Sequence, residues 1–357
     1  MNMKALLIAV VFFLLVVNGA RVESRRLDED SDDQDQGYKL FVFGDSYADN
    51  GNLEKSDKSW TTRAWYYPYG ISDSAHDQKP TGRSSNGMVQ SDFIAKILGL
   101  NESPPAERLR DSDGVDYSSG VNFAVSGAGA GDYEGSDEEV PNLGAQINKL
   151  ERLVGRGNAD LTDSVALIAF SGSRDYADVN ITSSNEVVET AQDVTDLIAD
   201  GVDRLKQLGV AKVLVNELPP MGCRPWDSRP KNYEHCDSAV NVITTFHNMY
   251  LRQKLGNKTD SVLLLDMKSA FTDLVVFPHN GPSPSDQFEN KYTPCCDSID
   301  PVGYCGQEDE DGSAQYSLCD NPDEYFFWDY MHPTEAGWKA VAEKLEQPIK
   351  DFLGISG

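Results

Sequence analysis

The residues best suited to covalent chemistry in this chain are a serine near its start and a histidine near its end. Ser46 follows the apolar run 40–43 within the segment KLFVFGDSYADNGN, residues 39–52. Such a run predicts a buried strand, and Gly-Asp-Ser after it is typical of a turn or a helix cap. Reactive groups of open α/β sheets lie at the carboxyl ends of parallel strands. Ser46 is thus placed where a nucleophile would be, although the triplet alone is equally typical of an ordinary turn.

The second reactive segment is FFWDYMHPTEAGW, residues 326–338, in which Asp329 precedes His332 by one tight turn. A serine hydroxyl is a good nucleophile only when a base accepts its proton, and an imidazole does so when a carboxylate fixes its tautomer. The other histidines, at positions 76, 235, 247 and 279, have no such setting. We therefore expect Ser46 as nucleophile, His332 as general base and Asp329 as the acid that orients it.

These segments resemble the GDSL esterase/lipase family, also called SGNH hydrolases, and are most similar to its secreted plant-type branch. Residues 44–46 match the first block of the family, with Tyr47 where leucine is usual, and residues 49–52 extend the match. GVNFAVSGAG, residues 120–129, resembles the second block, and Asp-x-x-His followed by Pro-Thr-Glu resembles the fifth. The resemblance runs in order from about residue 38 to 353. It implies a secreted serine esterase or lipase that hydrolyses carboxylic esters by Ser-His-Asp acyl transfer.

The resemblance also implies an oxyanion hole. Its donors would be the backbone N–H groups of Ser46 and Gly127, since a backbone can approach an oxyanion closely where no Cβ intervenes. The third block of the family, Gly-x-Asn-Asp, adds an asparagine side chain, but here the stretch is AFSGSRDY, residues 169–176, and Arg174 stands in its place. Arg174 is then either a third donor or a reason for slow turnover. Asp175 is expected to support the loop.

Two alternatives from other functional classes remain open. One is a catalytically weak secreted binding or defence protein on the same fold, and the other is a carbohydrate esterase that removes O-acetyl groups from polysaccharide. The long polar segment 52–88 bears on the second alternative because it is rich in aromatic residues. These either line a substrate cleft as a sugar platform or pack beneath the loop; they are Trp60, Trp65, Tyr66, Tyr67 and Tyr69.

Apolar runs alternate with helical patterns along the rest of the chain. Strands are expected at 40–43, 114–123, 164–170, 211–215 and 261–266, and helices at 88–98, 185–208, 238–255, 267–276 and 334–353. Strands that alternate with helices predict parallel βαβ units. The fold expected is a three-layer α/β/α sandwich with a flavodoxin-like parallel sheet, in a single domain over residues 38–357.

The first 37 residues have a composition of their own. Residues 1–24 combine Lys4, the apolar stretch 5–17 and small polar residues, which is typical of a secretory signal peptide. That stretch is too short to span a hydrocarbon core of about 30 Å, so no stable membrane anchor is expected. Residues 25–37 are an acidic run without apolar periodicity, which predicts a disordered tail. The mature protein is expected outside the cell.

The six cysteines all lie in the second half of the chain. An oxidising compartment favours disulfides over metal ligation, and six cysteines allow fifteen pairings. Cys223 with Cys236 is the pair we expect first, and closing that loop would contribute about 3 kcal/mol. The adjacent Cys295 and Cys296 cannot readily pair with each other. We expect them to reach Cys305 and Cys319, or one of them to pair with another loop.

Charge and short motifs narrow the partners. The chain has 31 basic and 58 acidic residues, a net charge of −27. A surface this negative repels nucleic acid and anionic membranes, so neither is expected as a partner. The family resemblance implies a small-molecule or lipid ester as substrate, and we expect the chain to be a monomer. No cofactor is expected, and no metal, because paired C-x-x-C spacing is absent. Glycosylation sequons at Asn101, Asn180 and Asn257 fit a secreted surface.

Overall fold

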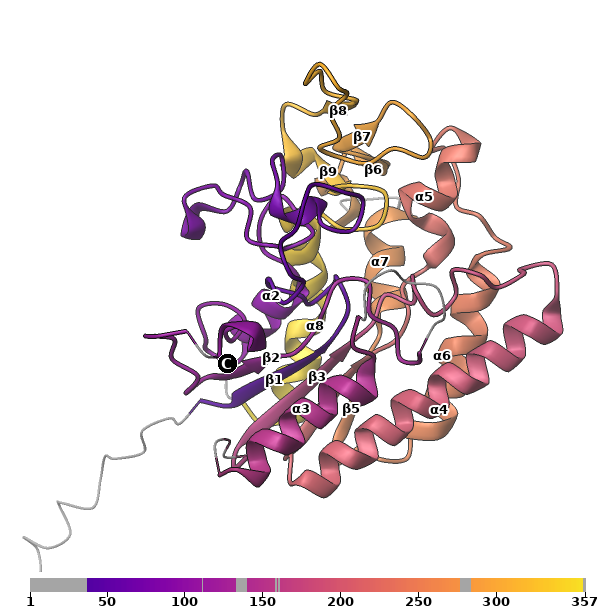
Figure 1. Cartoon of the computed structure of the whole chain (residues 1–357). Helices are drawn as coiled ribbons and strands as arrows, with labels where there is room; N and C mark the ends of the chain where they lie inside the picture. Colours follow the sequence, from indigo (N-terminus) through magenta and orange to yellow (C-terminus); the bar gives the residue numbers. More distant parts are fainter. Residues whose placement is uncertain are drawn as a thin grey trace, which may run out of the picture. The chain divides into compact units, whose positions relative to one another are not determined.

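The computed structural model describes residues 37–110, 112–132, 140–157, 159, 161–276 and 284–355. The predicted signal peptide lies outside the described residues, as does the predicted acidic tail up to residue 36. The described part from Tyr38 onward is built around a five-stranded sheet in the order β2-β1-β3-β4-β5 (Figure 1). This is the strand order of flavodoxin-like sheets. The predicted fold class is confirmed.

All strand pairs in this sheet are parallel. The strands are rich in valine, leucine, isoleucine and phenylalanine and are buried on both faces, as strands of parallel sheets must be when helices cover both sides. Successive side chains point to opposite faces, so each strand contributes to two cores. The strands are β1 (Lys39–Gly44), β2 (Gly120–Asn122), β3 (Ser164–Ala169), β4 (Lys212–Asn216) and β5 (Val262–Leu265).

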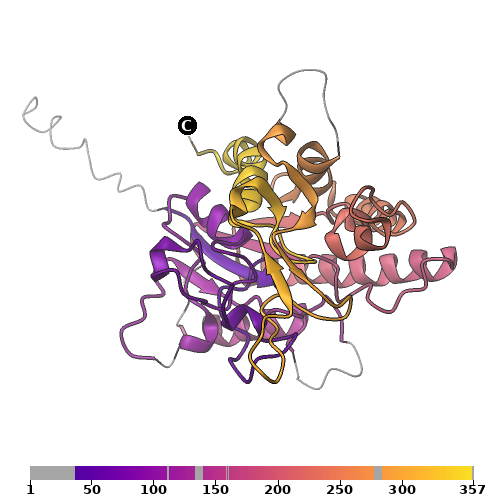
Figure 2. The same cartoon turned by 90° about the horizontal axis from the view of Figure 1, so that it is seen from above.

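Helices α2 (Gln90–Ile97), α7 (Met267–Val275) and α8 (Glu335–Leu353) cover one face of the sheet. They pack with Leu40 and Val42 of β1 in one apolar core. In Figure 2, α8, drawn in yellow, lies on the opposite side of the strands from α4, drawn in pink. Each helix therefore buries an apolar stripe whose exposure to water would be unfavourable.

Helices α3 (Leu143–Gly155), α4 (Ser184–Leu208) and α6 (Asn241–Leu255) cover the other face. They share a second core with Phe41 and Phe43 of β1, and α4 packs against both of its neighbours (Figure 1). Successive side chains of β1 thus point alternately into the two cores. The sheet is rigidly held at the edge where the strands end.

One predicted strand is too long, and one helix was not predicted. The strand predicted over residues 114–123 is wrong for its first six residues, because β2 begins at Gly120. Gly114 has φ +83° and Ser118 donates to Asp116, so the chain turns there despite the alternating apolar residues. Helix α3 was not predicted, although Leu143, Ile147, Leu150 and Leu153 show helical spacing and form its buried face.

A segment without predicted structure, residues 284–327, forms two small sheets. Strand β6 (Asn290–Pro294) pairs in parallel with β9 (Tyr325–Phe327), and β7 (Cys296–Ser298) pairs antiparallel with β8 (Tyr316–Leu318). The structure pairs Cys223 with Cys236, as expected, and joins Cys295 to Cys319 and Cys296 to Cys305. The last two disulfides lie in a buried group that we call the disulfide cluster: Ala64, Tyr69, Cys295, Cys296, Cys305 and Trp328.

Candidate active site

Ser46 follows the carboxyl end of β1 directly, as predicted. The turn begins at Gly44, where a Cβ would lie 2.1 Å from the carbonyl oxygen of Ala169, so only glycine allows the ends of β1 and β3 to approach this closely. Gln146 of α3 holds the same residue from the other side. Its Oε1 accepts from Gly44 N at 2.9 Å and its Nε2 donates to Gly44 O at 3.0 Å. The backbone that presents Ser46 is therefore fixed by a strand and a helix.

The structure brings Ser46, His332 and Asp329 together. Ser46 Oγ lies 2.8 Å from His332 Nε2, although 286 residues separate them in the chain. His332 Nδ1 lies 2.7 Å from Asp329 Oδ1. Exposed fractions are 9% for Ser46, 4% for His332 and 2% for Asp329, so exposure falls from the nucleophile to the orienting acid. This arrangement lets the imidazole accept the hydroxyl proton while the carboxylate fixes the ring.

The turn that carries the histidine is held by its own backbone. Trp328 N donates to His332 O at 2.7 Å, and Asp329 Oδ1 accepts from His332 N at 2.9 Å. Helix α8 begins immediately afterwards, with the Thr334 hydroxyl accepting from Gly337 N at 2.9 Å as an N-cap. The Asp-x-x-His turn is thus held in place between strand β9 and helix α8.

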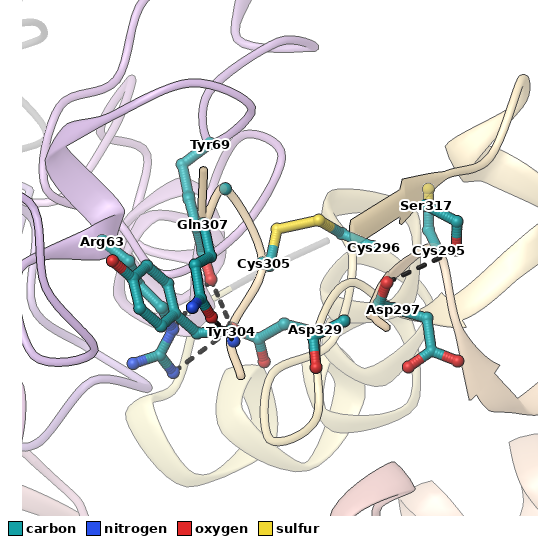
Figure 3. Close-up of a disulfide and its surroundings, with 12 residues drawn as sticks. Arg63, Tyr69, Cys295, Cys296, Asp297, Tyr304, Cys305, Gln307, Ser317 and Asp329 are labelled. Carbon is teal, nitrogen blue, oxygen red and sulfur yellow. Dashed lines mark hydrogen bonds and ion pairs between the residues drawn. A yellow bond between two sulfur atoms is a disulfide. The ribbon is translucent and has the colours of Figure 1, made fainter. Parts of the chain in front are cut away.

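The second carboxylate oxygen of Asp329, Oδ2, is contacted by two side chains that were not predicted as site residues. Tyr69 Oη donates to Oδ2 at 2.7 Å, and Arg63 Nη2 lies 3.4 Å from the same oxygen (Figure 3). Burial by itself raises the pKa of Asp329, but His332 and Arg63 hold that pKa well below its ordinary value. The carboxyl is therefore ionised at neutral pH. Nothing in the local pattern of residues 52–88 indicated this contact.

Tyr47 stands where the family usually has leucine, and the structure accommodates it. Its ring is fully buried and lies edge-on to Trp338 of α8, with centroids 4.9 Å apart. It also lies edge-on to His332 at 6.2 Å. The larger ring fills the space between the reactive turn and α8, so this departure from the family pattern is a packing change.

The backbone N–H groups of Ser46 and Gly127 have the freedom an oxyanion hole requires. Within the described ranges neither of them donates to a protein acceptor. Gly127 has φ +84°, and nothing lies within 4 Å of the position of a Cβ there. The loop around it is anchored by Asp49 Oδ2, which accepts from Ser126 N at 2.8 Å, and by Asp175 Oδ1, which accepts from Ala130 N at 2.8 Å. Asp175 supports the loop, as expected.

The third block is held against the serine turn by Asp45. This buried carboxylate accepts from Ser171 N at 2.7 Å and from Ser171 Oγ at 2.6 Å. Burial raises the pKa of Asp45 to about 6. Arg224 supports the block from another direction, since its Nη1 donates to Ser173 Oγ at 2.9 Å. Arg174, half-buried, lies on the wall of the cavity that contains Ser46 and Gly127.

The reactive serine opens into a cavity of about 570 Å³. Of the aromatic residues in segment 52–88, Trp60 lines this cavity, while Tyr69 is buried in the disulfide cluster and Trp65 donates Nε1 to Leu53 O. A larger cavity, of about 850 Å³, is lined by none of the three reactive residues. The chemistry therefore belongs to the smaller cavity, whose walls are Ser46, Ser59, Trp60, Thr61, Arg63, Ser126, Gly127, Val140, Ser173, Arg174, Met331 and His332.

The three sequon asparagines, Asn101, Asn180 and Asn257, are exposed. In the part of the chain that the structure describes, every helix is too short or too polar to traverse a bilayer.

A serine at the end of the first strand of a flavodoxin-like sheet, with Asp-x-x-His just before the last helix, defines a serine hydrolase of the SGNH type. Residues 40–345 match the model of the GDSL-like lipase/acylhydrolase family. The chain belongs to this family and is a serine ester hydrolase.

Curated relatives extend over most of the chain. One GDSL esterase/lipase of Arabidopsis thaliana is 35% identical over 325 residues, which cover 87% of this chain and 88% of the relative. Another from the same plant is 36% identical over 330 residues, 88% of each chain. Among solved structures, Est24, a carbohydrate acetylesterase from Sinorhizobium meliloti, is 12% identical with a TM-score of 0.41 and covers 88% of this chain and 99% of its own. A likeness that low does not bear on substrate.

Proposed function

We propose that this chain hydrolyses carboxylic esters of small molecules or lipids with Ser46 as nucleophile, His332 as general base and then acid, and Asp329 as the orienting acid. The observation that carries the proposal is the 2.8 Å contact between Ser46 Oγ and His332 Nε2. It joins two segments from opposite ends of the chain in a geometry that a structural role does not require. The carboxylate behind the imidazole completes the arrangement.

In the first half of the reaction, Ser46 Oγ attacks the carbonyl carbon of the ester while its proton passes to His332 Nε2. The carbonyl oxygen becomes an oxyanion, which accepts hydrogen bonds from the N–H groups of Ser46 and Gly127. The intermediate collapses to an acyl-serine, and His332 returns the proton to the leaving alcohol oxygen. Water then attacks the acyl-serine and gives its proton to His332, which passes it to Ser46 Oγ as the bond to the acyl group breaks and the carboxylic acid leaves.

The cavity is suited to an ester of modest size. Its volume of about 570 Å³ lies within the range of roughly 300–1,000 Å³ that small-molecule sites occupy. Trp60, Val140 and Met331 provide an apolar wall for an acyl chain, and Ser59, Thr61 and Ser173 provide hydroxyls on the other walls.

We further propose that the protein is a secreted, glycosylated monomer. The signal-peptide pattern of residues 1–24 and three disulfides support secretion, and three exposed sequon asparagines support glycosylation. Disulfides form and persist in oxidising compartments, and sequons are used on the secretory route.

The test is covalent labelling by a fluorescent organophosphonate, followed by hydrolysis of p-nitrophenyl esters of increasing acyl length. We expect Ser46→Ala to abolish both labelling and hydrolysis while its thermal melting matches that of the unmodified chain. Ser118→Ala, at an exposed serine bonded to Asp116, is the control and should leave labelling intact. Mapping of the label to any other serine by mass spectrometry would contradict the proposal.

A further inference from the structure

Two side chains from segment 52–88 form a chain of hydrogen bonds that ends on Asp329. Arg63 Nε donates to Tyr69 Oη at 2.9 Å, and Tyr69 Oη donates to Asp329 Oδ2 at 2.7 Å. Arg63 Nη2 also approaches that oxygen at 3.4 Å. Figure 3 shows both side chains beside Asp329 and near the Cys296–Cys305 disulfide. The carboxylate oxygen Oδ2 of Asp329 is thus contacted by both side chains.

Both side chains are held firmly in place. The Tyr69 ring has no exposed surface and lies edge-on to Trp328 within the disulfide cluster, with centroids 5.9 Å apart. The Arg63 guanidinium lies over the Trp60 ring at 4.6 Å and donates to the Trp60 carbonyl. Its side chain is 11% exposed. Because neither group can rotate freely, their contacts with Asp329 are built into the fold.

We propose that Tyr69 and Arg63 are positioning residues of this site: Tyr69 fixes the rotation of the Asp329 carboxylate, and Arg63 sets the lower pH limit of turnover through its charge. The inference rests on the proposed function and adds the two residues that act through the acid. Neither touches the reacting atoms.

The roles differ because the two groups differ in charge. Oδ1 of Asp329 accepts from Met331 N at 2.8 Å, His332 N at 2.9 Å and His332 Nδ1, so Oδ2 needs a donor of its own to keep the carboxylate plane in place. Tyr69 supplies this donor and adds no charge. Arg63 adds a positive charge beside Asp329, and a positive charge there opposes the gain of a second one on the neighbouring imidazole.

Other charged groups around the pair are engaged elsewhere. Among the described residues, the ion pairs of Asp329 are those with His332 and Arg63. Other ionisable groups near the pair bond elsewhere: Asp45 to Ser171, Arg224 to Asp227 of α5 (Pro225–Ser228), and Glu335 to the Met88 backbone. Tyr47 lies edge-on to His332, and its hydroxyl bonds to the Met331 carbonyl. Arg174 also lines the cavity with His332, but among the described residues Arg63 is the arginine that pairs with Asp329, so Arg63 is the cation to test.

The first test removes the phenolic hydroxyl. We expect Tyr69→Phe to lower kcat about tenfold, the effect of losing one hydrogen bond to a charged group, with KM changed less than about twofold. The acid limb of the kcat/KM profile should stay in place, because no charge is lost. Tyr66→Phe is the matched control, since that hydroxyl lies in the same segment and donates to the Ser56 carbonyl. It should leave kcat unchanged.

The second test removes the charge. We expect Arg63→Gln to move the acid limb of the kcat/KM profile upward by about one pH unit, because a positive charge 3.4 Å from Asp329 opposes a second positive charge on the imidazole that the same acid holds. Arg63→Lys should restore most of the limb. Arg108→Gln is the matched control: Arg108 lies over the Trp65 ring at 5.0 Å and donates to the Gly51 carbonyl, and it has no ion pair with an acid among the residues that the structure describes.

A readout that needs no turnover separates this inference from the proposed function. In the Ser46→Ala chain, the proton between His332 Nδ1 and Asp329 gives a low-field NMR resonance. Arg63→Gln should move the pH at which this resonance changes upward by about one unit, and Arg108→Gln should not. Coincident curves would overturn the role of Arg63, whether or not the chain hydrolyses esters. For Tyr69, a loss of thermal stability with unchanged kcat at saturating ester would show a purely structural role.

Discussion

At the scale of single residues, two buried aspartates at the site have opposite electrostatic environments. Asp329 faces an imidazole and a guanidinium, so its pKa lies well below the ordinary value despite burial. Asp45 accepts from Ser171 and from Tyr47 N, which are neutral donors, and burial raises its pKa to about 6. One carboxylate is thus kept charged for catalysis, and the other holds loops together.

Replacing the orienting acid should separate turnover from binding. We expect Asp329→Asn to lower kcat by several orders of magnitude, roughly 10⁴-fold in the serine protease that serves as a precedent, while KM changes little. The amide cannot stabilise the imidazolium and favours the wrong tautomer. Steady-state kinetics on p-nitrophenyl acetate would measure this effect. Turnover near that of the unmodified chain would mean that another group orients His332.

Arg174 is the residue whose replacement should raise activity. An asparagine amide is a compact neutral donor, whereas arginine is longer, always charged and strongly prefers carboxylates. We expect Arg174→Asn to raise kcat on a small activated ester at least about tenfold, a fraction of the 10²–10³ that one oxyanion donor contributes. A fall in kcat would identify the guanidinium as the third donor. Arg156→Asn, at an exposed arginine after α3, is a control for the change of charge.

At the scale of elements, helix α3 and the long segment 52–88 support the strand ends and turns that carry the site. Helix α3 contacts β1 through Gln146, which has no exposed surface and binds both polar groups of Gly44. Segment 52–88 reaches the opposite side of the site through Trp60, Arg63 and Tyr69. The disulfides join the small sheets beneath it. These supports hold the reactive turns to within hydrogen-bonding distance of each other.

The contact between α3 and β1 should be important for stability. Gln146→Leu leaves the buried N–H of Gly44 without its partner, while Gly44 O still accepts from Val125 N, and one such group costs about 1–3 kcal/mol. We expect the free energy of unfolding, measured in urea, to fall by about 1–3 kcal/mol. Gln192→Leu, on the exposed side of α4, is the control and should change it by less than about 0.5 kcal/mol. Equal values for the two variants would show that water replaces the amide.

At the scale of the whole molecule, the chain is strongly acidic, yet two arginines line the reactive cavity. The net charge is −27, and Arg63 and Arg174 lie on the wall next to Ser46. Three neighbouring strands end next to the site: β1 before Ser46, β2 before Gly127 and β3 before Arg174. The carboxyl ends of these parallel strands therefore bring the three residues together. Histidines also affect the molecule as a whole, because unfolding exposes the buried ones.

His247 of α6 should make stability depend on pH. Burial lowers its pKa from 6.5 to about 3, and its Nδ1 lies 2.8 Å from Tyr176 Oη. The unfolded chain binds a proton at this residue below pH 6.5, whereas the folded chain does so only near pH 3. The free energy of unfolding should therefore fall by about 1.4 kcal/mol per pH unit as pH drops through this window.

The check is urea denaturation from pH 7 to pH 4 on the unmodified chain and on His247→Gln, with exposed His235→Gln as control. The difference between the two curves isolates the contribution of His247 from that of Asp45. The raised pKa of Asp45 changes the free energy of unfolding in the opposite direction: its stabilising effect is complete below pH 3.8 and is lost as pH rises to about 6. Parallel curves would show that the unfolded state shields this histidine.

The sequence determined the features that depend on neighbouring residues. Apolar periodicity indicated parallel βαβ units, and short spacing identified Ser46 at a strand end and Asp329 with His332 on one turn. These signals are local because strand alternation, helix spacing and tight turns are properties of adjacent residues. The spacing that marks α3 was also present, although the sequence analysis did not assign a helix there.

Only the tertiary structure decided which distant groups meet. Tyr69 and Asp329 lie 260 positions apart, and Gln146 and Gly44 lie 102 apart. The partners of Cys295 and Cys296 were settled in the same way. No local pattern encodes such pairs, because each depends on how whole elements pack and on which face each side chain occupies. The support of the reactive residues is therefore a property of the fold, whereas their identity is visible in the chain.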